Sequence, residues 1–295
     1  MDVSSFAERP IVFACNGLRL VGVVAVPRQP IRRGVVIVVG GPQYRAGSHR
    51  QFTLLCRHLA ERGIASLRFD YHGLGDSEGP PALGVDGLAD DLRCAIDALM
   101  NEVPELDGVV LWGLCGAASA AALYVPDDAR VAGVVMLNPN AGGEDATAAA
   151  QLRFYYLGRL LNTAFWRRLL RGEVRVLASL RDLWQSVCKA FGTRLAAAPS
   201  EDAVGDGPPP TRPLAERVLQ ALGRAPGVRL LVILSGNDLT AQAFLQLASS
   251  ARGWRRLMAS PRVTCHHLPE ANHTFATAEW RGQVEQWTAH WVTGL

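Results

Sequence analysis

The feature that most constrains the fold of this sequence is a regular alternation of apolar runs and amphipathic segments. Residues 34–39 (GVVIVV) form a continuous apolar run, which is typical of a strand buried on both faces. Similar runs follow at residues 64–69, 108–112, 131–137 and 228–234. Between two of them, apolar residues recur at three- and four-residue steps, as in a helix: Val85, Leu88, Leu92, Ile96 and Leu99. The alternation predicts an α/β protein with a mostly parallel central sheet flanked by helices, and with its active loops at the carboxyl ends of the strands.

A β-hairpin is expected to open the chain. Residues 11–14 and 20–26 are rich in β-branched side chains, and Asn16-Gly17 lies between them. Both residues tolerate the positive φ angles of a two-residue hairpin turn.

The alternation stops at residue 141 and resumes at residue 214. Residues 141–213 begin as a helical, aromatic-rich segment and end, from residue 196, in a stretch dominated by alanine, glycine and proline. We therefore expect an α/β core in two parts, 1–140 and 214–295, with a helical cap or lid at 141–213 whose end is flexible. The aromatic residues suggest an apolar or acyl-bearing substrate. Packing of the cap on the core explains them equally well.

Composition and short motifs exclude several classes of function. The net charge is only +3 and no long basic run occurs, so no nucleic-acid partner is expected. No apolar stretch reaches about 18 residues and the first ten residues lack the order of a secretory signal, so neither a membrane span nor export is expected. The six cysteines lack paired spacing, which favours free thiols in the cytoplasm. We see no metal, flavin or nucleotide motif and expect no cofactor.

Residues 113–117 (GLCGA) have the form of a nucleophile elbow around Cys115. The segment joins the run at 108–112 to a small-residue helix, with Gly113 and Ala117 two positions either side of the cysteine. This tight strand-to-helix turn requires small residues at those places. Ser119 lies a full turn into the helix and is a poorer candidate. Considered alone, the pentapeptide also fits an ordinary buried thiol on a tight turn.

An acid and a base follow Cys115 in the order that this type of site requires, which is nucleophile, acid, histidine. Asp238 comes directly after an apolar strand, and His273 lies between the strand-like residues 262–268 and the last helix. Asp238 would also serve as a helix N-cap. Three other histidines follow Cys115 and fit less well, two in the strand itself and one in the tryptophan-bearing last helix: His266, His267 and His290. The agreement in order and placement favours Cys115, Asp238 and His273 as a catalytic triad.

The oxyanion hole is expected to draw on two loops. The first N–H group belongs to Gly116, the residue after the nucleophile, and the second to the loop that follows residues 34–39. Pro42 has no N–H group, so Gln43 or Gly41 is the candidate donor. Tyr44, Arg45, His49 and Arg50 in the same loop are candidates for binding a polar or anionic substrate. Surface arginines near a helix start are the equal alternative.

Four motifs together resemble the exosortase A system-associated hydrolases: GGPQYRAGSHRQF, RFDYHGLGDSEG, GLCGAAS and ILSGNDLTA. These proteins belong to the α/β-hydrolase superfamily, in a branch similar to serine aminopeptidases and monoacylglycerol lipases. The resemblance covers most of the chain outside residues 196–213. It implies a cysteine nucleophile at Cys115 with Asp238 and His273 as partners. The family elbow typically carries an acidic residue after the cysteine, where this chain has Gly116.

The residues predict a hydrolase that forms a covalent acyl-enzyme on a small-molecule ester or thioester, which a carrier protein could present. An acyltransferase would use the same triad with an alcohol or amine as acceptor. A catalytically silent α/β-hydrolase fold that acts as a binding protein is the rival from another class. Neither acyl specificity nor oligomeric state follows from the sequence.

Overall fold

The computed structural model describes residues 5–40, 43–80, 84–140 and 212–295, which belong to one compact unit. The expected cap at 141–213 lies outside the described residues except for its last two, and so do Gly41 and Pro42. The strands are β1 (Phe6–Cys15), β2 (Leu18–Pro27), β3 (Arg33–Val38), β4 (Ser66–Phe69), β5 (Gly108–Leu114), β6 (Val131–Leu137), β7 (Arg229–Asn237) and β8 (Val263–Asn272). The helices are α1 (Gln51–Ala60), α2 (Ala89–Glu102), α3 (Gly116–Tyr124), α7 (Leu214–Arg224), α8 (Leu239–Ser250), α9 (Arg252–Met258) and α10 (Ala278–Thr293), with 3₁₀ turns at Ser48–Arg50, Asp86–Leu88 and Val125–Asp127.

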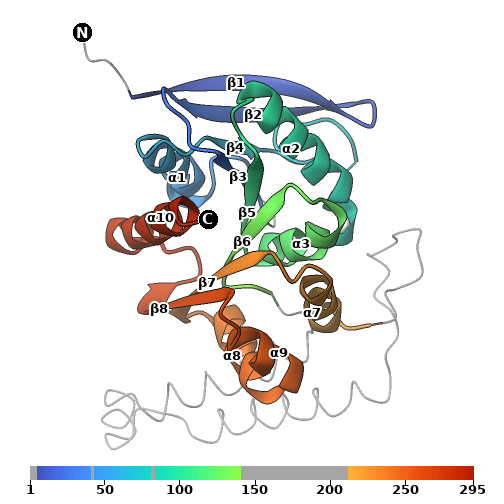
Figure 1. Ribbon diagram of the computed structural model, residues 1–295, viewed down its shortest axis with the longest axis vertical. Helices are drawn as coiled ribbons and strands as arrows, with labels where there is room; N and C mark the ends of the chain where they lie inside the picture. Colours follow the sequence, from blue (N-terminus) through green and yellow to red (C-terminus); the bar gives the residue numbers. More distant parts are fainter. Residues whose placement is uncertain (1–4, 41–42, 81–83, 141–211) are drawn as a thin grey trace, which may run out of the picture. The chain divides into compact units, whose positions relative to one another are not determined.

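The strands form one sheet in the order β1-β2-β4-β3-β5-β6-β7-β8 (Figure 1). β1 pairs antiparallel with β2, and β2 with β4, while every pairing from β4 to β8 is parallel. The predicted mostly parallel sheet is therefore confirmed. The predicted opening hairpin is present as well, with Asn16 and Gly17 at φ 49° and 82° in its turn.

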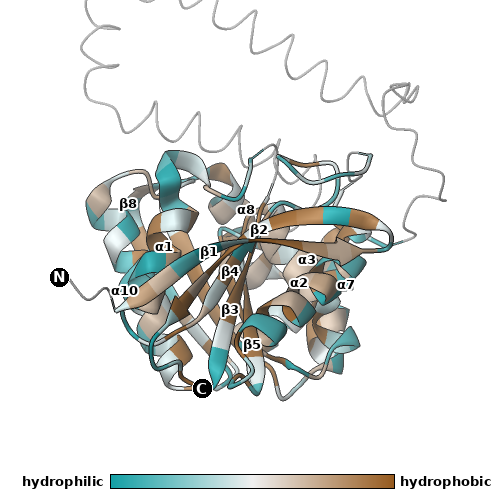
Figure 2. Ribbon diagram, turned by 90° about the horizontal axis from the view of Figure 1, so that it is seen from above, coloured by the Kyte–Doolittle hydropathy of each residue, from teal (hydrophilic) through white to brown (hydrophobic). Residues whose placement is uncertain are grey.

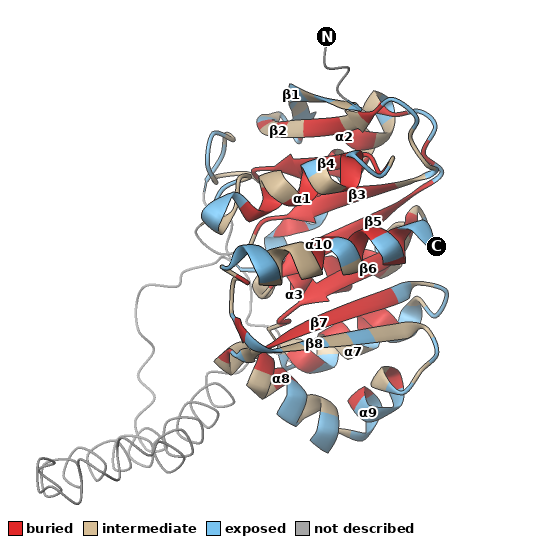
Figure 3. Cartoon of the chain, turned by 90° about the vertical axis from the view of Figure 1, so that its left-hand side faces the viewer, coloured by how far each residue is buried: buried red, intermediate tan, exposed pale blue. Residues whose placement is uncertain are grey.

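Helices cover both faces of the sheet, α1 and α10 on one and α2, α3 and α7 on the other (Figure 1). Successive side chains of a strand point to opposite faces, so each central strand supplies both cores. In β5, Val109 and Leu111 pack with α2 and α3, whereas Val110 and Trp112 pack with α1 and α10. This explains why the central strands are continuous apolar runs and are buried along their length (Figures 2 and 3).

The carboxyl ends of the parallel strands meet at one edge of the sheet, as expected. The elbow follows β5 there, Asn138 follows β6, and Asp238 and His273 follow β7 and β8. β8 runs four residues beyond the strand-like residues 262–268, to Asn272, although it contains Pro269. An edge strand tolerates proline because one row of its N–H groups needs no partner in the sheet.

Two further features bear on the sequence-based expectations. None of the helices in the described residues is long and apolar enough to cross a membrane. Five cysteines in the described part are free thiols: Cys15, Cys56, Cys94, Cys115 and Cys265.

Candidate active site

Cys115 has the backbone conformation of a nucleophile elbow. Its φ and ψ angles are 58° and −121°, a strained combination for a residue with a side chain. Hydrogen bonds hold the turn: the Cys115 N–H donates to the carbonyl of Leu137 at 2.9 Å, and the Ala118 N–H donates to the carbonyl of Cys115 at 3.1 Å. The turn places the cysteine at the amino end of α3, where unpaired backbone N–H groups gather.

Close backbone approach explains two glycines around the elbow. A Cβ on Gly113 would lie 2.5 Å from the carbonyl carbon of Ala117 and 2.6 Å from the nitrogen of Ala118. A Cβ on Gly40, which follows β3, would lie 2.7 Å from the carbonyl oxygen of Leu114. All three distances are too short for any side chain. The loop after β3 therefore begins directly against the elbow, where the second oxyanion donor was expected.

Asp238 and His273 form a pair beside Cys115. His273 Nδ1 lies 3.0 Å from Asp238 Oδ2, and the Asp238 side chain is buried whereas His273 is partly exposed. Asp238 also caps α8, because its carboxylate accepts from the backbone N–H groups of Thr240 at 3.3 Å and Ala241 at 3.0 Å. The N-cap interpretation and the triad interpretation of Asp238 thus hold together: the helix end fixes the carboxylate that faces the imidazole.

Hydrogen bonds raise the pKa of His273 to about 10. The larger contribution comes from Asp238 and the next from the side chain of Cys115, while burial acts in the opposite direction. Since Nδ1 faces Asp238, the second ring nitrogen, Nε2, is left for the thiol. The imidazole is thus positioned between the cysteine and the carboxylate, and its charged form is stabilised there.

A bulge at the end of β7 sets the position of Asp238. The pairing of β7 with β8 shifts register between Ser235 and Asn237. A Cβ on the intervening Gly236 would lie 1.9 Å from the carbonyl oxygen of Pro269, so only glycine allows this approach. Bulges next to active sites commonly re-aim the residue that follows.

The predicted oxyanion and substrate-binding residues lie around the same edge. Gly116 begins α3, so its N–H group has no acceptor within the helix. Gln43 Oε1 accepts from the Ser48 N–H at 3.3 Å. Tyr44 is 53% exposed, and the exposed Arg50 adopts φ 60° at the start of α1. Gly41, the other candidate for the second donor, lies outside the described residues.

Arg45 is held within the protein. Its backbone N–H donates to Asp70 Oδ1 at 2.6 Å, and its guanidinium pairs with Asp70 and, at 2.6 Å, with Asp76. Asp70 is fully buried and follows β4. It also accepts from the Asp76 N–H at 3.1 Å. The positive charge of Arg45 is therefore balanced internally, and the pair anchors the loop after β3 to the loop after β4.

Two residues at the site were missed in the sequence, Asp70 and Asn138. Each is the first polar residue after a buried run, at the edge that carries the triad. That position is the available signal, because a buried polar side chain at a strand end needs hydrogen-bond partners.

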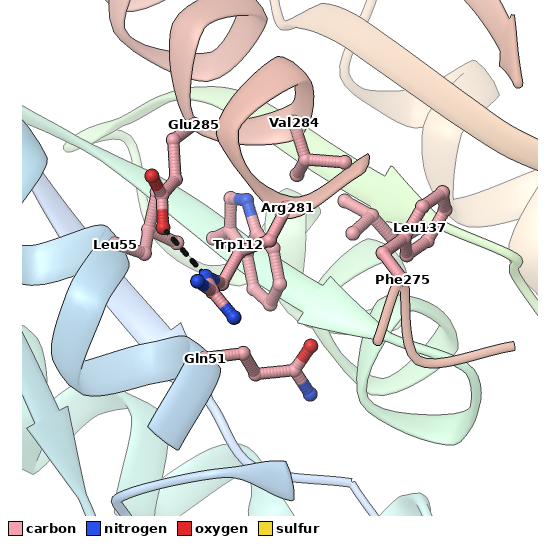
Figure 4. Close-up of a pocket in the computed structure, with 8 residues that line it drawn as sticks. All are labelled: Gln51, Leu55, Trp112, Leu137, Phe275, Arg281, Val284 and Glu285. Atoms are coloured by element: carbon pink, nitrogen blue, oxygen red, sulfur yellow. Dashed lines mark ion pairs between the residues drawn. The ribbon is translucent and has the colours of Figure 1, made fainter. Parts of the chain in front are cut away.

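A small pocket lies between the sheet and the helices α1 and α10 (Figure 4). Its lining residues are Gln51, Leu55, Trp112, Leu137, Phe275, Arg281, Val284 and Glu285. Arg281 Nε lies 3.6 Å from Glu285 Oε1, and burial raises the pKa of Glu285. The enclosed space suffices for about one water molecule, so the pocket does not hold an acyl chain as it stands.

Within the described residues no group of three or more histidine, cysteine or acidic side chains is arranged to hold a metal ion. The arrangement that the structure brings together is a thiol, an imidazole and a carboxylate beside a helix start.

The sequence matches the family model described as serine aminopeptidase, S33, over residues 30–190, more than half of the chain. The chain belongs to this family, and the protein is a hydrolase of the α/β type. No curated protein matches its sequence.

Solved structures with the same fold include several esterases. An esterase of Pyrococcus furiosus is 16% identical with a TM-score of 0.62, covering 98% of this chain and 92% of its own. A thermostable carboxyl esterase of Bacillus coagulans, solved with glycerol, is 14% identical with a TM-score of 0.62 and 98% coverage of both chains. A dienelactone hydrolase of Anabaena variabilis is 14% identical with a TM-score of 0.57 and 98% coverage of both. At these identities the likeness establishes the fold alone.

Proposed function

We propose that this protein cleaves carboxylic esters or thioesters through a Cys115–His273–Asp238 triad and a covalent acyl-enzyme. The observation that carries the proposal is the contact of Cys115, in the elbow conformation, with an imidazole whose Nδ1 pairs with a buried carboxylate at 3.0 Å. The family is named for serine enzymes, so cysteine at the elbow is the departure that the proposal must explain.

In the first half-reaction His273 Nε2 holds the proton of the Cys115 thiol, and the thiolate sulfur bonds to the carbonyl carbon of the substrate. The carbonyl π electrons move to its oxygen, and the N–H groups of Gly116 and of the loop after β3, from Gln43 or Gly41, stabilise the oxyanion. As the oxyanion collapses, the bond to the leaving oxygen or sulfur breaks. The leaving group takes the proton from His273, whose charged form Asp238 stabilises.

In the second half-reaction a water molecule gives a proton to His273, and its oxygen attacks the acyl carbon. The carbon–sulfur bond breaks, which restores the Cys115 thiolate beside the protonated His273, and the carboxylic acid leaves. An alcohol or amine in place of water makes the same residues an acyltransferase.

The thiol favours esters and thioesters over amides. A tetrahedral intermediate on cysteine expels whichever attached group leaves more readily, and a thiolate leaves far more readily than an unprotonated amine. With an amide the intermediate therefore returns to substrate unless the amine is protonated strongly. We accordingly place the activity with the esterases of this fold and not with peptidases.

We propose that residues 141–213 cap the site. The described part of the core runs to Asn140, just past the carboxyl end of β6, and continues from residue 212 into α7, so the segment is attached at the edge that carries Cys115. A short acyl ester that slows proteolysis of this segment in the wild-type protein, but not in Cys115→Ala, would support the cap. Equal proteolysis in both would contradict it.

The four sequence motifs support a place among the exosortase A system-associated hydrolases. An exosortase gene close to the gene of this protein would support that placement, and its absence would count against it. The five free thiols of the described residues support a reducing compartment such as the cytoplasm. A carrier-bound acyl thioester is the natural alternative to a free ester.

Initial rates on a matched substrate set test the proposal. Nitrophenyl butyrate and a butyryl thioester should be turned over, whereas butyryl nitroanilide should not. Cys115→Ala should abolish turnover, and Cys265→Ala, which removes an exposed thiol on β8, should leave it unchanged. A silent binding protein would show no turnover that depends on Cys115.

A further inference from the structure

Asn138 connects the ends of three strands beneath the triad. It follows β6, is fully buried, and adopts φ 40°. Asparagine is among the few residues other than glycine that enter this region readily. Its Oδ1 accepts from the Ser235 N–H at 2.8 Å, and its Nδ2 donates to Ser235 Oγ at 2.8 Å and to the backbone carbonyl of His273 at 3.0 Å.

The same short segment also holds the nucleophile. The carbonyl of Leu137 accepts from the Cys115 N–H at 2.9 Å, and the Asn140 N–H donates to the carbonyl of Cys115 at 3.3 Å. Residues 137–140 thus hold the elbow on one side through their backbone and the His273 loop on the other through the Asn138 side chain.

We propose that Asn138 is a positioning residue that sets the His273 imidazole against Cys115. The inference rests on the proposed triad and adds a fourth residue to it. His273 is the first residue after β8, so its carbonyl takes no part in the pairing of the strands. Among the described residues, the Asn138 amide is the group that holds this carbonyl in place. With that donor removed, the loop gains freedom while the pair of Asp238 and His273 pulls the ring toward α8.

The amide is required by the chemistry of its partners. In two of its three hydrogen bonds the Asn138 side chain is the donor. One of the two acceptors is the His273 carbonyl, which cannot donate in return. A carboxylate of the same size would keep the bond from the Ser235 N–H but place a negative oxygen against that carbonyl. Aspartate is therefore the sharpest probe, because it changes the donor and little of the volume.

Alkylation of Cys115 by iodoacetamide across pH tests the proposal in Asn138→Asp, Asn138→Gly, Ser235→Ala and His273→Gln. This readout needs no substrate, so it is independent of the ester assay. In Asn138→Asp and Asn138→Gly the rate of Cys115 alkylation at neutral pH should change about tenfold. The dependence of that rate on pH should move toward the one measured for His273→Gln. Ser235→Ala, which leaves the bond to His273 intact, should keep the wild-type profile.

Ester turnover supplies the second arm. For both Asn138 variants kcat should fall about 10- to 100-fold with KM nearly unchanged, since small misplacements of a catalytic group have effects of this size. Folded Asn138 variants with the wild-type alkylation profile and kcat would overturn the proposal. If Asn138→Gly does not fold, Asn138→Asp decides alone. A wild-type protein without ester turnover or acyl adduct contradicts the proposed function instead, and leaves the alkylation result to decide the role of Asn138.

Discussion

The carboxylate of Asp238 lies 3.0 Å from His273 Nδ1 and at the same time caps helix α8. One side chain therefore has a structural partner, the helix, and a partner in the proposed triad, His273, and substitution can separate the two. Asparagine remains a good N-cap but carries no charge for the imidazole.

Asp238→Asn should reduce kcat/KM about a thousandfold to ten-thousandfold, as expected when an orienting carboxylate becomes an amide. Its midpoint of thermal unfolding should fall less than that of Asp238→Ala, because asparagine keeps the cap and loses only the charge that stabilises His273. Asp238→Ala should lose the cap as well, which lowers the free energy of unfolding by about 1 kcal/mol. Equal stability of the two variants, or full activity of Asp238→Asn, would contradict this division.

Gly113→Ala should destabilise the protein by about 1–3 kcal/mol or more, because the new methyl group meets backbone atoms of the elbow. The matched control is Gly223→Ala in α7, where a Cβ meets nothing within 4 Å. That change should raise the free energy of unfolding by about 0.5–1 kcal/mol. Urea unfolding of both variants gives the comparison, and similar midpoints would refute the close approach at Gly113.

Asp70→Asn should be strongly destabilising, by about 3–5 kcal/mol, since it leaves the Arg45 guanidinium without its buried partner. It should also lower kcat, because the loop after β3 loses its anchor. Asp76 binds the same guanidinium but has a 66% exposed side chain, so Asp76→Asn should cost under about 1 kcal/mol. Chemical unfolding and ester turnover of Asp70→Asn and Asp76→Asn give the comparison. Similar losses in the two variants would contradict the anchoring role of Asp70.

The pH dependence of stability follows from His273. Its pKa is raised to about 10 in the folded protein, so folding stabilises the charged imidazole. This contribution is fully present below the unfolded value near pH 6.5 and is lost as pH rises through about 10. The difference in unfolding free energy between wild type and His273→Gln should therefore be largest at pH 6 and shrink steadily by pH 10. A difference that grows with pH would mean that the imidazole is neutral in the fold.

The sequence predicts that Cys115, Asp238 and His273 lie together because their positions depend on local patterns and on chain order. Cys115 lies in a pentapeptide with small residues at the required places, and Asp238 and His273 directly follow strands. The order of elements then brings all three to one edge. Their chemistry at that edge stays a prediction until the thiol is tested.

The positioning residues were missed because their partners are remote in sequence. Asn138 binds Ser235 and His273, 97 and 135 residues away, and nothing local indicates those contacts. Arg45 was considered as a substrate ligand because the sequence does not reveal its pairing with Asp70. The extension of β8 through Pro269 depends on its position at the sheet edge, which propensity alone does not give.

The central claim is that Cys115 carries the acyl group. The direct measurement is the intact mass of the protein after brief reaction with a butyryl thioester, followed by peptide mapping. We expect one added butyryl group, located on Cys115. The adduct should be absent in Cys115→Ala and retained in Cys265→Ala, and it should live longer in His273→Gln once formed. No adduct, or acylation spread equally over the other cysteines, would contradict it.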